Sequence, residues 1–68
     1  MPDLYSSKYI IKILKKNGFE FISQKGSHKK FKKGMQIVII PDPKKEIPMG
    51  TFFSILRQSN LRKEDFKK

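Results

Sequence analysis

The sequence predicts an α+β domain with the element order α-β-β-β-α, in which two helices pack on one face of a three-stranded antiparallel sheet. Apolar residues recur with helical spacing near both ends of the 68-residue chain, and they alternate or form short blocks between these ends. Glycines divide the middle of the chain into three segments of strand length. The chain contains no internal repeat or flexible linker, so we expect a single domain over residues 1–68.

The first helix is expected at about residues 7–17. Ile10, Ile13 and Leu14 follow the i, i+3, i+4 spacing of a buried stripe. The opposite face carries lysines, at Lys8, Lys12, Lys15 and Lys16. The serines at its start can accept hydrogen bonds from the free N–H groups of the first turn, and Gly18 can end the helix in a left-handed conformation.

Three strands are expected at residues 19–24 (FEFISQ), 28–32 (HKKFK) and 35–40 (MQIVII). Turns at Gly26 and Gly34 join them as an antiparallel meander.

The segment PDPKKEIP holds three prolines, so it can continue neither a central strand nor a helix. A second helix is expected at about residues 50–59, because apolar side chains share one face there: Phe52, Ile55 and Leu56. A short last turn over residues 62–66 follows.

The charge of the chain narrows the classes of partner. Sixteen Lys and Arg residues against six Asp and Glu residues give a net charge of +10. Such a field attracts nucleic acid, an anionic membrane or an acidic protein. A membrane-surface role is disfavoured because no segment combines a basic face with a broad apolar face. Lysines that serve only solubility are the simpler alternative.

Other features of the composition exclude several kinds of site. The chain has no cysteine, and its one histidine and scattered carboxylates lack metal-ligand spacing, so we expect no metal and no other cofactor. No apolar run approaches a membrane span, and the N-terminus lacks the features of a signal peptide. We therefore expect a cytoplasmic protein.

The only histidine, His28, lies in the lysine-rich stretch QKGSHKKFKKG. Phe31 is the one apolar residue of the second strand, so it should face the helices. His28 is three positions away, and side chains alternate along a strand, so it should face the other side with Lys30 and Lys32. A bulge in this strand would reverse that prediction.

This position suits a general base. Free imidazole titrates at about pH 6.5, and nearby lysines disfavour its charged form, so we expect His28 to be mostly neutral at neutral pH. It could remove the proton of a ribose 2′-OH, whose oxygen would attack the adjacent phosphorus while lysines stabilise the phosphorane. The products would be a 2′,3′-cyclic phosphate and a 5′-hydroxyl end, and DNA would be spared. The sequence does not identify the group that protonates the leaving oxygen.

Each of these residues also has a simpler explanation. A lone histidine beside a turn is usually a polar surface residue. Gly26 suits a hairpin turn that needs positive φ, and Ser27 can cap such a turn. The residues alone leave catalysis open.

Several motifs together resemble the HicA toxins of bacterial and archaeal toxin–antitoxin pairs. These are KKNGFEF at the end of the first helix, QKGSHKKF, the apolar strand after it, and PDPKKEIPMGTFFSILRQSNL. The resemblance covers nearly the whole chain. It implies a double-stranded-RNA-binding-like fold, metal-independent mRNA cleavage, and inhibition by a HicB-type antitoxin in a hetero-oligomer.

The resemblance also implies roles for individual residues. His28 corresponds to the catalytic histidine of the family, with Gly26 and Ser27 as its motif neighbours. Many members have Pro-His-Pro where this chain has Pro41-Asp42-Pro43, so no role of that second histidine can be transferred. With the lysines of the same stretch, the predicted RNA-binding residues are Lys25, Gly26, Ser27, Lys29, Lys30 and Lys32.

Two other functions fit the residues. A non-catalytic double-stranded-RNA-binding module of the same fold would bind phosphates through Lys29, Lys30, Lys32 and the helix lysines. A protein-directed role would use the basic surface to bind an acidic partner. Loss of cleavage on removal of His28 would identify the nuclease. Salt dependence would test phosphate binding, since contacts to about four phosphates of a single strand predict a log–log slope of about −3.

Overall fold

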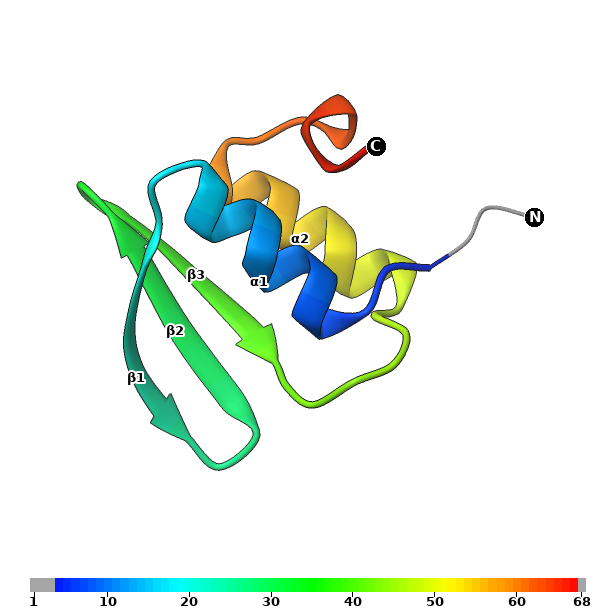
Figure 1. Cartoon of the computed structure of the whole chain (residues 1–68), viewed down its shortest axis with the longest axis horizontal. Coiled ribbons are helices and arrows are strands. Elements are labelled where there is room, and N and C mark those ends of the chain that lie inside the picture. Colours follow the sequence, from blue (N-terminus) through cyan, green and yellow to red (C-terminus); the bar gives the residue numbers. More distant parts are fainter. Residues whose placement is uncertain (1–3, 68) are drawn as a thin grey trace.

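The computed structural model describes residues 4–67 and has the predicted order of elements (Figure 1). Helix α1 spans Ser7–Lys16 and helix α2 spans Met49–Ser59, and a short 3-10 helix, η1, follows at Lys63–Phe66. The three strands are β1 (Glu20–Lys25), β2 (His28–Lys33) and β3 (Gln36–Pro41). The α+β fold is confirmed, and each element begins and ends within one residue of the predicted bounds.

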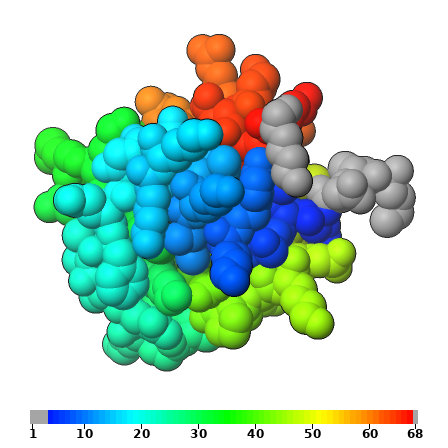
Figure 2. Space-filling model, in the orientation of Figure 1, coloured from blue at the N-terminus to red at the C-terminus, as the bar shows by residue number. Residues whose placement is uncertain are grey.

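Helix α1 begins and ends where its sequence provides partners for the free backbone groups. Ser6 is the N-cap residue, and its side chain accepts a hydrogen bond of 3.1 Å from the Tyr9 N–H. Asn17 follows the last turn, and Gly18 has a φ of 93°, a conformation that glycine adopts without steric cost. In the space-filling view, α1 (blue) lies at the centre of the visible face (Figure 2).

The sheet has the order β1-β2-β3, and both pairs of strands are antiparallel. The pairing of β2 with β3 is regular, whereas β1 has a bulge between Phe21 and Ser23. Both helices lie on the same side of the sheet, and the other side is open (Figure 1).

The core lies between the helices and the two strands β2 and β3. Phe21 of β1 keeps 48% of its surface exposed, although its ring contacts the Phe31 ring at a centroid distance of 5.7 Å. The helix layer therefore leaves β1 largely uncovered. Buried apolar residues form the core: Ile10, Ile13, Leu14, Phe19, Phe31, Val38, Ile40, Ile47, Phe52, Ile55 and Phe66.

The two outer edges of the sheet differ. On β3, the Ile39 N–H donates to Oε1 of Gln58 in α2 at 3.1 Å, and Pro41 has no N–H to donate. Gln36 adds a second link to α2 by donating from Nε2 to the Ser59 carbonyl at 3.1 Å. The outer edge of β1 pairs with no strand among residues 4–67.

The short helix η1 packs against the core. Phe66 of η1 is fully buried, with its ring edge-on to Phe52 at a centroid distance of 5.2 Å. None of the helices within residues 4–67 is long and apolar enough to cross a membrane.

Candidate functional site

His28 is the first residue of β2, and its side chain is exposed on the open face of the sheet. Phe31, three positions along the same strand, is 1% exposed and faces the helices. The register of β2 with β3 is unbroken from His28 to Lys33, and the bulge of the sheet lies in β1. The alternation that predicted this placement therefore holds.

Cross-strand pairing brings other site residues beside His28. Lys25 of β1 is its direct neighbour, and Ser23 lies opposite Lys30. A hollow on this face is lined by Ser23, Lys25, Gly26, His28, Lys30 and Ile39. The structure thus gathers four of the predicted site residues, and Lys32 continues the same face of β2.

The imidazole of His28 forms no hydrogen bond or ion pair within residues 4–67. Its ring nitrogens are not engaged by the described part of the protein. A ring in this state can exchange a proton with a bound molecule.

The two central residues of the turn before His28, Gly26 and Ser27, are held by hydrogen bonds to their backbone carbonyls. Gly26 has a φ of 60°, the arrangement of a type II′ hairpin turn with glycine in its first central position. A Cβ atom at Gly26 would meet nothing within 4 Å, so the backbone conformation and not space requires glycine. Gln24 donates from Nε2 to the Gly26 carbonyl at 2.9 Å, and the Ser27 carbonyl accepts a 2.7 Å hydrogen bond from the Asp42 N–H.

Lys29 differs from the other predicted RNA-binding lysines. It faces the helix side of the sheet, where its Nζ lies 2.6 Å from Oδ2 of Asp42. The same alternation that turns His28, Lys30 and Lys32 to the open face turns Lys29 away from it. The structure therefore does not bring Lys29 together with the His28 hollow.

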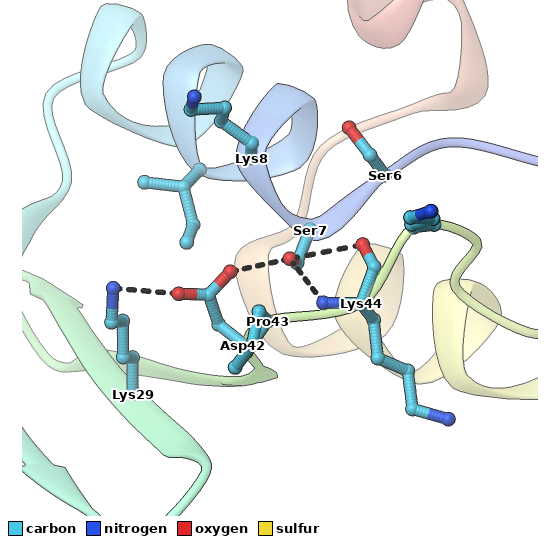
Figure 3. Close-up of a pocket in the computed structure, with 9 residues that line it drawn as sticks. Ser6, Ser7, Lys8, Lys29, Asp42, Pro43 and Lys44 are labelled. Atoms are coloured by element: carbon cyan, nitrogen blue, oxygen red, sulfur yellow. Dashed lines mark hydrogen bonds and ion pairs between the residues drawn. The ribbon is translucent and has the colours of Figure 1, made fainter.

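Asp42 is a residue whose contacts sequence reasoning missed. Figure 3 shows its carboxylate between Lys29 and Ser7. Oδ1 accepts a 2.5 Å hydrogen bond from Ser7 Oγ, which in turn accepts from the Lys44 N–H at 3.0 Å. The hydrogen bond from Lys29, followed by that from Ser7, holds the pKa of Asp42 below its usual value. Position 42 differs from the histidine of many family members, and this departure was the one signal in the sequence.

The described residues offer no evident metal centre. No group of three Asp, Glu, His or Cys side chains within residues 4–67 is placed to hold a metal ion.

Comparison with known families identifies the chain. The family model described as the HicA toxin of bacterial toxin–antitoxin matches residues 7–61, from the first residue of α1 to just beyond α2. The chain belongs to the HicA toxin family. The matched range of this HicA toxin contains both the His28 hollow and Asp42 with its partners. No individual curated protein matches the chain closely enough to be named as a relative.

Membership makes this protein a toxin of the toxin–antitoxin type, and a HicA toxin acts in partnership with an antitoxin. The predicted resemblance is thereby confirmed.

Proposed function

We propose that this HicA toxin is an endoribonuclease that cleaves mRNA on the open face of its sheet, with His28 as the general base. The observation that carries the proposal is the His28 hollow. An exposed imidazole without a hydrogen-bond partner within residues 4–67 lines this hollow together with two lysines, Lys25 and Lys30.

The chemistry follows from these groups. His28 removes the proton of a ribose 2′-OH, and the 2′ oxygen attacks the adjacent phosphorus. Lys25 and Lys30 hold the phosphate and stabilise the negative charge that develops on it. The 5′ oxygen of the next nucleotide leaves and takes up a proton from water, which gives a 2′,3′-cyclic phosphate and a 5′-hydroxyl end. Gly26 and Ser27 shape the turn at which the phosphate binds.

A HicB-type antitoxin is the proposed inhibitor, and cytoplasmic mRNA is the proposed substrate. The open face carries its lysines beside partly exposed apolar side chains, among them Ile37 at 39% exposure. Positive charge attracts RNA and an acidic protein alike, whereas exposed isoleucine suits a protein partner. One face thus serves both the substrate and the inhibitor in a hetero-oligomer.

The test compares the wild type with His28→Ala on one long single-stranded RNA in EDTA, beside DNA of the same sequence. We expect the wild type to cut the RNA and spare the DNA, because DNA lacks the 2′-OH. The His28→Ala variant should bind RNA with similar affinity and cut about 10²- to 10⁴-fold more slowly, the usual contribution of a general base.

A matched control is Met35→Ala. Met35 is 98% exposed in the turn between β2 and β3, at the opposite end of the strand from His28. This variant should cleave at the wild-type rate. If the wild type and His28→Ala both bind RNA and neither cuts it, with native circular-dichroism spectra, the protein is a non-catalytic RNA-binding module. Equal cleavage by both would remove His28 from the mechanism.

A further inference from the structure

We infer that Asp42 is a positioning residue for His28: it ties the two residues that flank the histidine, Ser27 through its backbone and Lys29 through its side chain, to the start of α1. The inference rests on the proposed function, because it concerns the placement of the proposed base. Asp42 itself lies on the other side of the sheet from the imidazole and does not act on the substrate.

Asp42 contacts both chain neighbours of His28. Its N–H donates to the Ser27 carbonyl at 2.7 Å, and its Oδ2 lies 2.6 Å from the Lys29 Nζ. The first contact holds the backbone of Ser27 and the second holds the side chain of Lys29, so both residues that flank His28 are tied to Asp42. Since His28 has no side-chain partner within residues 4–67, its backbone is what the protein uses to place the ring.

Asp42 also connects this segment to the helix layer. Ser7 Oγ has a single proton to donate. The Oγ atom lies 2.5 Å from Asp42 Oδ1 and 3.2 Å from the Lys44 carbonyl oxygen. The carboxylate is the closer and charged acceptor, and the Lys44 carbonyl already accepts from the Ser7 N–H at 2.9 Å. Ser7 is 1% exposed at the start of α1, so Asp42 ties the β1–β2 turn end of the sheet to a buried point.

The side-chain contacts of Asp42 can be removed without changing the shape of the residue. Asp42→Asn keeps the backbone bond to Ser27 but leaves Lys29 without its anionic partner. A misplacement of the base by about 1 Å costs up to about 100-fold in rate. We therefore expect single-turnover RNA cleavage to slow by about 10- to 100-fold, with little change in RNA affinity.

Backbone mobility gives a readout that is independent of activity. We expect the order parameters from ¹⁵N relaxation to fall at Ser27, His28 and Lys29 in Asp42→Asn, and to stay unchanged in α2. A general loss of stability would lower the order parameters of α2 as well as those of residues 27–29.

Asp65→Asn is the matched control. It makes the same change of charge in a carboxylate that accepts a hydrogen bond, here from the Arg62 backbone N–H at 2.8 Å in the segment that leads into η1. Figure 1 shows η1 at the opposite side of the molecule from the β1–β2 turn. This variant should cleave at the wild-type rate and keep residues 27–29 ordered.

Lys29→Met covers the case in which Asp42→Asn does not fold. It keeps the apolar stem of a side chain that does not face the open side, and it breaks the same ion pair. We expect it to slow cleavage as well, with RNA affinity preserved.

The outcomes separate the two proposals. If the wild type cleaves and Asp42→Asn and Lys29→Met cleave at the same rate, the positioning role is wrong and the nuclease stands. Slower cleavage without a change of order at residues 27–29 also overturns the positioning role. If the wild type does not cleave, the proposed function fails and the positioning role fails with it.

Discussion

Asp42 stands where many HicA toxins have a histidine, and its environment makes it an acid that stays ionised. The ion pair with Lys29 is partly exposed, with 29% of the lysine and 17% of the aspartate side chain accessible. Solvent weakens a pair of this kind, so its contribution to stability is modest. The structural role of Asp42 is to connect β2, the end of β3 and the start of α1 through its contacts with Lys29 and Ser7.

The lowered pKa of Asp42 predicts a pH dependence of stability. Above its usual pKa of 3.8, the carboxylate is ionised in both states and its contacts favour the folded one; that contribution is lost as pH falls through the lowered pKa. We expect wild type to exceed Asp42→Asn in free energy of unfolding by up to about 1 kcal/mol above about pH 5. The gap should close below about pH 4, as measured by urea unfolding across pH. A gap that is constant into strong acid would contradict the ion pair.

Two glycines of the chain should respond in opposite ways to a methyl group. Neither Gly26 nor Gly50 has an atom within 4 Å of an added Cβ, but Gly26 has a φ of 60° and Gly50 lies in α2 without a positive φ. We expect Gly26→Ala to lower the free energy of unfolding by about 1 kcal/mol, the cost of a left-handed residue. Gly50→Ala should raise it by up to about 0.5 kcal/mol through helix propensity. Changes of the same sign in chemical denaturation would show that conformation is not the cause.

At the scale of the elements, helix α1 depends on the cap at its start. The Ser6 side chain accepts from the Tyr9 N–H, and α1 carries the buried serine that binds Asp42. We expect Ser6→Ala to cost about 1 kcal/mol in thermal or urea unfolding. Ser54→Ala, inside α2, is the control and should be neutral or slightly stabilising, because alanine has the higher helix propensity. An equal loss in both variants would argue against the cap.

The elements were predictable from the sequence because each rests on local periodicity. The i, i+3, i+4 spacing of Ile10, Ile13 and Leu14 indicated α1, and the spacing from Phe31 to His28 placed the histidine on the open face. The position of Lys29 followed from the same alternation, but grouping the lysines by their nearness in sequence obscured it.

The link between Ser7, Lys29 and Asp42 could not be predicted in this way. Ser7 and Asp42 are 35 positions apart, and their contact depends on how the end of β3 meets the start of α1. No periodicity within an element encodes such a meeting. The exposure of Phe21 could not be predicted from the sequence either, because it depends on how far the helix layer extends over the sheet.

At the scale of the whole molecule, the positive charge is divided between two faces. Lys25, Lys30 and Lys32 lie on the open face of the sheet, and the lysines of α1 lie in the helix layer on its other side. Lys29 is neutralised by Asp42 and does not join either set. The proposed RNA site therefore holds three lysines, one fewer than the four that the sequence predicted as RNA-binding.

This division predicts the salt dependence of RNA binding. Contacts of three lysines with a single strand give a log–log slope of about −2, and Lys30→Met should reduce it to about −1.4. Fluorescence anisotropy of a short labelled RNA across NaCl concentrations measures both. Lys15→Met removes the same charge from α1 and should leave the slope at about −2. Equal effects of the two variants would show that the overall positive charge of the protein attracts the RNA, and that the RNA does not bind specifically to the open face.

The unequal edges of the sheet limit how copies of this protein can associate. On the outer side of β3, Gln58 occupies the Ile39 N–H and Pro41 has no N–H, so this edge is blunted, whereas the outer edge of β1 pairs with no strand within residues 4–67. A sheet that can accept a strand at one edge only can pair with one other chain, which is either a second copy of this protein or a partner that offers a strand. Assembly by strand addition therefore ends at two components, and the open-ended stacking that leads to fibres has no second edge from which to continue.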